Sequence, residues 1–166
     1  WSFATFPGDQ EALERIRDNH TGWLDAAALG VTRLGWTPVS TVLMVVTVVA
    51  LFVMRRRADS LVVALSGIPI GIGLLLKDVI GRARPDYFLT SSAPSSFSFP
   101  SGHSLFAMLF GGLLIVLIED LRVSTLIRRS LQSGLVLLIL GVGASRVYLG
   151  VHWPSDVVGG YLFGIW

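Results

Sequence analysis

Three short polar stretches contain the side chains of this sequence that could do chemistry. The first is Lys77-Asp-Val-Ile-Gly-Arg82-Ala-Arg84-Pro85, which places three cations close together. Pro85 restricts the backbone and would aim Arg84 in a defined direction. Each cation alone could simply extend its charge to lipid headgroups. Together they have the donors that bind a phosphate.

The second stretch is Ser98-Phe-Pro100-Ser101-Gly102-His103-Ser104, directly before an apolar run. Ser101 is a good helix N-cap. Gly102 would let the backbone approach a ligand, and the amides at a helix start bind anions. The cap and the anion site are compatible, and His103 would lie within reach of the same anion.

The third stretch is Ser145-Arg146-Val-Tyr-Leu-Gly-Val-His152-Trp-Pro154-Ser-Asp156. If Pro154 occupies the first turn of a helix, Asp156 lies close to His152. A carboxylate on one imidazole nitrogen fixes the tautomer and leaves the other nitrogen free to attack. A His–Asp pair of this kind can equally be structural.

The composition indicates a membrane protein. Of the 166 residues, 52% are hydrophobic and 14% are charged, against about 25% charged in soluble domains. The absence of cysteine excludes disulfides, thiolate metal sites and cysteine nucleophiles. A net charge of +2 is too small to indicate a nucleic-acid partner.

Five apolar segments predict an all-α, polytopic membrane helix bundle forming a single domain over residues 1–166. An open strand would leave backbone groups unpaired in lipid, so each segment must be helical. A bilayer crossing takes about 20 helical residues. The expected spans cover residues 37–54, 60–76, 103–118, 130–149 and 154–166.

Arginine clusters predict the orientation. Arg55–Arg57 follow the first span, and Arg122, Arg128 and Arg129 lie between the third and fourth. Short loops rich in arginine stay on the cytoplasmic side. The three polar stretches therefore fall on the outer face.

Residues 1–36 are expected to be helical and amphipathic, with Asp9 as an N-cap. Two placements fit this pattern equally well. The helices either lie on the outer membrane surface or form a cap packed on the outer loops.

The charge balance of the polar stretches predicts an anionic ligand. Lys77, Arg82, Arg84 and Arg146 would share one membrane face, with only Asp78 and Asp86 near the first three in sequence. Ionisable groups at membrane depth are costly and are usually functional. A phosphate would supply the missing negative charge.

The chain resembles the type 2 phosphatidic acid phosphatase superfamily. The resemblance rests on Lys77 followed by six residues and then Arg84-Pro85, on Pro100-Ser101-Gly102-His103, and on Ser145-Arg146 followed by His152 and Asp156 at the family spacing. It implies a six-helix membrane core, whose first helix would precede residue 1.

The resemblance also implies roles for the motif residues. His152 would be the nucleophile that forms a phosphohistidine, Asp156 would orient it, and His103 would be the general acid and base. The phosphate would be bound by the cations and the helix start: Lys77, Arg84, Ser101, Gly102 and Arg146. The predicted chemistry uses no cofactor and no metal, because three fixed cations can neutralise the phosphate and no carboxylate cluster is present.

The expected substrate is a lipid phosphate or diphosphate at the outer face of a bacterial inner membrane. Family substrates include undecaprenyl diphosphate, phosphatidylglycerol phosphate and phosphatidate. The short loops resemble the small bacterial members and favour the first two. Arg82 is expected to contact a second phosphate or a headgroup.

Two alternatives remain open from the sequence. A non-catalytic lipid-anion binding protein or transporter would keep the cations, although it would not need a histidine oriented by a carboxylate. Vanadium haloperoxidases share the anion site, but they are soluble, which fits the apolar helices poorly.

Overall fold

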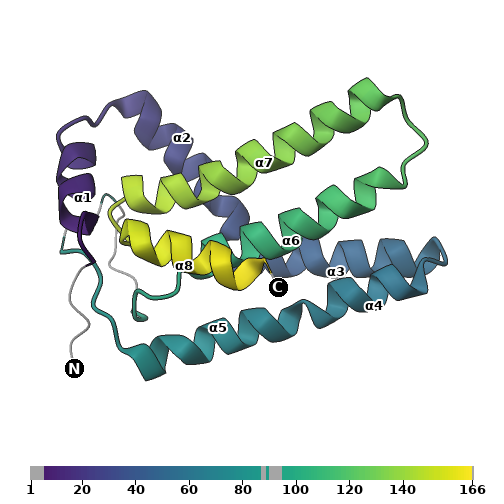
Figure 1. The fold of residues 1–166 in the computed structure, drawn as a ribbon, viewed down its shortest axis with the longest axis horizontal. Coiled ribbons are helices and arrows are strands. Elements are labelled where there is room, and N and C mark those ends of the chain that lie inside the picture. The colour runs from purple at the N-terminus through teal and green to yellow at the C-terminus, as the bar shows by residue number, and fades with distance from the viewer. Residues whose placement is uncertain (1–5, 87–88, 90–94, 166) are drawn as a thin grey trace.

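The computed structural model describes residues 6–86, 89 and 95–165, and every regular element in these ranges is helical. The expected all-helical membrane fold is confirmed. Figure 1 shows the long helices lying lengthwise in one bundle. Helix α6 contacts both α7 and α8. The elements are α1 (Asp9–Arg17), α2 (Gly22–Thr32), the 3₁₀ turn η1 (Arg33–Gly35), α3 (Thr37–Val53), α4 (Arg57–Leu65), α5 (Gly67–Ile80), α6 (Gly102–Glu119), α7 (Thr125–Tyr148) and α8 (Pro154–Gly164).

Three helical segments are long and apolar enough to cross a membrane: Arg57–Ile80, Gly102–Glu119 and Thr125–Tyr148. The first joins α4 and α5 and is longer than the expected range 60–76. Helix α3 qualifies only together with Gly22–Gly35, to which it is joined at a bend of 51°. In the described part of the expected fifth span, α8 has 11 residues, fewer than a bilayer crossing takes.

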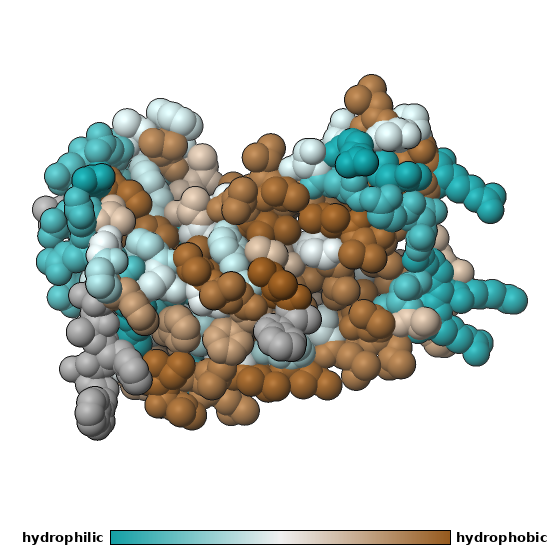
Figure 2. Space-filling model, in the orientation of Figure 1, coloured by the Kyte–Doolittle hydropathy of each residue, from teal (hydrophilic) through white to brown (hydrophobic). Residues whose placement is uncertain are grey.

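The arginine-rich turns lie together at one end of the bundle. Arg56 donates to Asp59 at 2.6 Å and also pairs with Asp120, which ties the α3–α4 turn to the α6–α7 turn. The C-terminus of α5 and the N-terminus of α8 lie at the opposite end (Figure 1). Figure 2 shows hydrophilic residues at both ends and a hydrophobic band between them. Membrane-spanning helices present this surface to lipid.

The N-terminal helices pack on the end of the bundle that holds the polar stretches. Leu13 of α1 is buried with Val147 and Val157, and α2 packs along α7. These contacts pack the segment against α7 and α8, and its position relative to the membrane surface stays a prediction. The expectation that Asp9 caps α1 is wrong, because Gly8 is the N-cap residue and forms no side-chain cap. The carboxylate of Asp9 is 3% exposed and bonded elsewhere.

Candidate active site

The start of α8 brings His152 and Asp156 together as the spacing predicts. Pro154 opens the helix, and Trp153 precedes it as the N-cap. The backbone N–H of Trp153 donates to Asp156 Oδ2 at 2.9 Å. The same oxygen lies 3.4 Å from His152 Nδ1. The carboxylate thus lies at the positive end of a helix and beside the imidazole.

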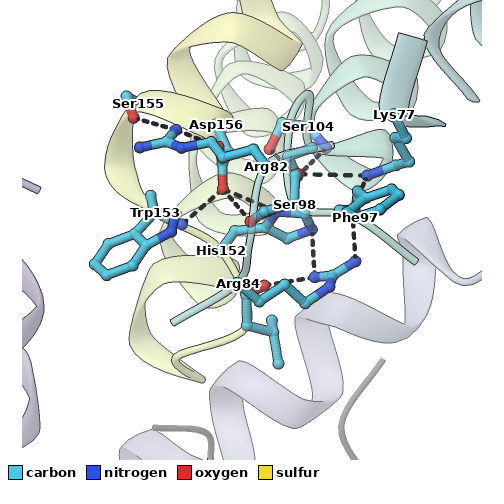
Figure 3. Close-up of polar contacts among 12 residues, drawn as sticks. Lys77, Arg82, Arg84, Phe97, Ser98, Ser104, His152, Trp153, Ser155 and Asp156 are labelled. Atoms are coloured by element: carbon cyan, nitrogen blue, oxygen red, sulfur yellow. Dashed lines mark hydrogen bonds and ion pairs between the residues drawn. The ribbon is translucent and has the colours of Figure 1, made fainter. Parts of the chain in front are cut away.

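Ser98 completes this group from the second polar stretch. Its hydroxyl donates to Asp156 Oδ2 and lies 3.4 Å from His152 Nδ1. Ser98 and Asp156 are both fully buried. Figure 3 shows these contacts around the imidazole of His152.

The contacts of His152 determine which ring nitrogen can attack. Its Nε2 lies 3.2 Å from Arg84 Nη1. Because a guanidinium only donates, Nε2 accepts and the ring proton is on Nδ1, facing Asp156. The Nε2 lone pair therefore points toward Arg84, away from the carboxylate. This tautomer is the one that a histidine nucleophile requires.

Burial also keeps His152 uncharged. The side chain is 2% exposed, and burial lowers its pKa from 6.5 to about 3. The hydrogen bond to Asp156 opposes this shift, and Arg84 and the other nearby cations add to it. A neutral imidazole is the nucleophilic form.

One cavity of about 490 Å³ contains most of the predicted site. His103, in the first turn of α6, faces it together with His152 from the α7–α8 loop. Six of the predicted catalytic and phosphate-binding residues line the cavity: Lys77, Arg84, Gly102, His103, Arg146 and His152. The fold thus brings segments from all three polar stretches to one site.

The cavity cations have no acidic partners. Among the residues that the structure describes, no carboxylate forms an ion pair with Lys77, Arg84 or Arg146. Lys77 Nζ donates to the carbonyl oxygens of Phe97 at 2.9 Å and Ser98 at 3.3 Å. Three positive charges in a largely buried cavity require a counter-ion. A phosphate matches them in charge and donor geometry.

Arg84 and Arg146 are held in different ways. The Arg84 guanidinium binds backbone oxygens, including Ser96 at 2.7 Å and Val151 at 2.5 Å. Arg146 donates to Thr32 Oγ1 at 2.6 Å, and its buried Nε has no protein partner. Arg146 therefore retains donors for a ligand.

Arg82 does not lie where the expected contact with a headgroup or second phosphate would place it. It is 2% exposed and does not line the cavity. Its Nη2 pairs with Asp9 at 2.6 Å and its Nη1 with Asp156 at 2.5 Å. The charge balance above counted Arg82 among the unmatched cations, which is wrong. Arg82 thus holds the Asp156 carboxylate beside His152 and links Asp156 to Asp9 of α1.

Ser101 lies behind the cavity wall. Its hydroxyl accepts from Ser104 Oγ at 3.0 Å and caps α6, and its amide donates to the Asp156 carbonyl at 3.0 Å. The cap interpretation thus describes its contacts. The adjacent Gly102 lines the cavity, so of Ser101 and Gly102 it is the better placed to meet a phosphate.

Four residues that support the site were not identified as site residues from the sequence: Asp9, Thr32, Gly35 and Ser98. A side chain on Gly35 would place its Cβ 2.5 Å from the His103 ring, so the backbone of η1 determines where that ring lies. Ser98 was part of a recognised motif and could have been suspected. The others come from the N-terminal segment, and nothing in their local pattern points to the site.

Comparison with known proteins agrees with this geometry. Residues 60–166 match the model of the PAP2 superfamily. Phosphatidylglycerophosphatase B of Bacillus subtilis is 37% identical over 86% of this chain and 71% of its own length. Undecaprenyl-diphosphatase of Sulfolobus acidocaldarius is 29% identical over 94% of this chain and 73% of its own length.

A solved structure has the same fold. The crystal structure of a transmembrane PAP2 type phosphatidylglycerolphosphate phosphatase from Bacillus subtilis superposes with a TM-score of 0.83 at 31% identity. The match covers 95% of this chain and 79% of the other. These relatives are named as lipid phosphatases, which removes the support for a transporter or a haloperoxidase. The chain therefore belongs to the PAP2 superfamily and is an integral-membrane lipid phosphatase.

Proposed function

We propose that this chain hydrolyses a lipid phosphate or diphosphate at the outer membrane face through a phosphohistidine on His152. The observation that carries the proposal is the single cavity that combines a neutral, carboxylate-oriented histidine with three cations that pair with no carboxylate of the described residues. Phosphoryl transfer requires this combination of positioning and charge neutralisation.

The residues perform the reaction in two steps. His152 Nε2 attacks phosphorus, a nitrogen–phosphorus bond forms, and the bond from phosphorus to the lipid-side oxygen breaks. His103 gives its proton to the leaving oxygen. It then takes a proton from water, which attacks phosphorus and releases inorganic phosphate and neutral His152. Lys77, Arg84 and Arg146 hold the phosphoryl oxygens throughout.

The two polar ends of the bundle indicate how the protein is oriented in the membrane. The arginine-rich turns lie at one end and the site lies at the other. With the arginine-rich end in the cytoplasm, the site faces outward, and the bacterial relatives support a bacterial inner membrane. Cysteine introduced at Ser124 should then resist a membrane-impermeant thiol reagent in spheroplasts, and ready labelling would reverse the orientation.

Substrate assignment is tested with a panel of lipid phosphates. Undecaprenyl diphosphate and phosphatidylglycerol phosphate are proposed on the strength of the named relatives. Phosphatidate is proposed as a substrate of the family. Purified protein in mixed micelles should release inorganic phosphate from at least one of them, and kcat/KM ranks them. No release from any of the three would overturn the proposal.

Activity should not depend on a metal ion. Lys77, Arg84 and Arg146 supply the positive charge that Mg²⁺ supplies to other phosphoryl-transfer enzymes. We expect kcat to change less than about twofold after treatment with EDTA. Activity that disappears with EDTA and returns with Mg²⁺ would contradict this expectation.

The rate should have a pH optimum, since His152 must be neutral and His103 protonated. With its pKa lowered to about 3, His152 stays neutral through the physiological range. The fall of kcat/KM at high pH therefore reports loss of the proton that His103 donates. As pH falls below 6.5, His152 takes up a proton in the unfolded chain but stays neutral in the folded protein. The free energy of unfolding therefore also falls.

A profile of kcat/KM that is flat from about pH 5 to about pH 9 would contradict these acid–base assignments. Imidazole ¹⁵N NMR separates the two histidines. The His152 signals, assigned with the His152→Ala variant, should show a neutral ring at pH 6. A ring that titrates near 6.5 would show that burial does not control its charge.

A further inference from the structure

The catalytic cavity continues beyond the cations, between α3 and α5. Below Lys77 it is lined by Leu74, Ile70 and Gly67 of α5. At about 1.5 Å per helical residue, these positions lie roughly 5, 10 and 15 Å from Lys77 along the helix. The cavity therefore extends from the phosphate-binding end well into the apolar part of the bundle.

Helix α3 forms the opposite wall, and its polarity changes with depth. The helix begins at Thr37, two residues after the close contact of Gly35 with His103. Thr37, Ser40 and Thr41 line the first turns of this wall, and Met44 follows. Descending from the catalytic end, the cavity presents cations, then hydroxyl groups, then hydrocarbon.

Two of these hydroxyls are free to bind a ligand. Among the described residues, no hydrogen bond involves the Thr37 or Thr41 side-chain oxygen, and both residues are exposed. In contrast, Ser40 Oγ donates to the Thr37 carbonyl at 3.0 Å. Thr47, deeper on α3, donates to the Leu43 carbonyl at 2.8 Å. Hydroxyls surrounded by hydrocarbon gain by finding an acceptor.

We propose that Thr37 and Thr41 donate hydrogen bonds to the ester carbonyl oxygens of a glycerolipid phosphate and so select this substrate class over polyprenyl phosphates. The inference rests on the proposed phosphatase function. In such a lipid the phosphate is followed by ester-linked glycerol and then by hydrocarbon chains, the same order as the cavity wall. A polyprenyl phosphate passes directly from phosphate to hydrocarbon and offers the two threonines no acceptor.

The cation set favours a monophosphate over a diphosphate. Arg82, the fourth cation of the motif region, is paired with Asp9 and Asp156 and does not line the cavity. The three cavity cations line the same cavity as His152, whose Nε2 lies 3.2 Å from Arg84 Nη1, and the transferred phosphoryl group must lie in this cavity. A phosphomonoester uses all three, whereas a diphosphate would bring further negative charge that they would have to share.

The test compares three substrates that differ in the region below the phosphate. They are dioleoyl phosphatidate, its dialkyl ether analogue, which lacks the carbonyl oxygens, and farnesyl phosphate. We expect wild-type protein in mixed micelles to prefer the ester to the ether by about tenfold in kcat/KM. The double variant Thr37→Val/Thr41→Val should lose about tenfold on the ester and less than twofold on the ether and on farnesyl phosphate.

Thr47→Val is the matched control, because it removes a hydroxyl from the same helix that is already bonded to the backbone. It should leave the ester preference unchanged. An equal loss on all three substrates in the double variant, or a wild-type protein that does not distinguish ester from ether, would overturn the inference. A wild-type protein that hydrolyses none of the three would also overturn the inference, and the panel of undecaprenyl diphosphate, phosphatidylglycerol phosphate and phosphatidate then decides the proposed function separately.

Discussion

Replacing His152 with alanine is expected to lower kcat by at least about 10³-fold, because the attacking nitrogen is removed. Binding of orthovanadate or inorganic phosphate should change little, since Lys77, Arg84 and Arg146 remain. Turnover by phosphate release and binding by calorimetry measure the two effects separately. Retained binding also shows that the variant is folded.

The chain contains a matched control for this variant. His20 Nδ1 lies 3.2 Å from Asp25 Oδ1, a His–Asp pair much like that of His152, but His20 does not line the catalytic cavity. His20→Ala should therefore keep kcat within a few-fold of wild type. If His152→Ala retains more than about 3% of the activity, the nucleophile is misassigned.

Replacing Arg82 with alanine is expected to destabilise the protein by about 3–5 kcal/mol, since it leaves the buried carboxylates of Asp9 and Asp156 without their cation. For a chain of this size the corresponding fall in Tm is roughly 10 °C. Arg82→Lys should lose less, because an ammonium group can still pair with one carboxylate. Thermal unfolding in detergent, followed by circular dichroism, gives both values.

An exposed ion pair on α1 is the control for this result. Arg15 and Glu11 pair at 2.6 Å with side chains 77% and 68% exposed. Arg15→Ala should shift Tm by less than about 2 °C, since exposed pairs contribute little to stability.

The opposite outcome for Arg82→Ala is equally informative. An unchanged Tm with a selective loss of activity on diphosphates would support the headgroup contact that the sequence suggested.

Much of the local architecture could be predicted from the sequence. Apolar segments in lipid have to be helical, so their length and order were enough to place α6 and α7. The His152–Asp156 pair was also local, because Pro154 starts the helix two residues after His152 and Asp156 in the first turn reaches back to the residues before the helix. The motif spacings then indicated a phosphate site, and the cavity contains six of the residues they named.

The partners of Arg82 could not be predicted in the same way. The sequence placed Asp78 and Asp86 near it, whereas the folded chain pairs it with Asp9 and Asp156, 73 and 74 residues away. Charge patterns report which groups need a counter-ion. They do not report which distant group supplies it.

The sequence by itself thus predicted the membrane helices, a phosphate site and the residues that line its cavity, because these depend on local spacing and on the cost of charge in lipid. The tertiary structure alone decided that the N-terminal segment belongs to the site. Thr32 reaches Arg146 across 114 residues, and Gly35 lies against His103. Apolar helices of similar hydropathy can pack in many arrangements, and only the arrangement adopted determines which distant side chains meet.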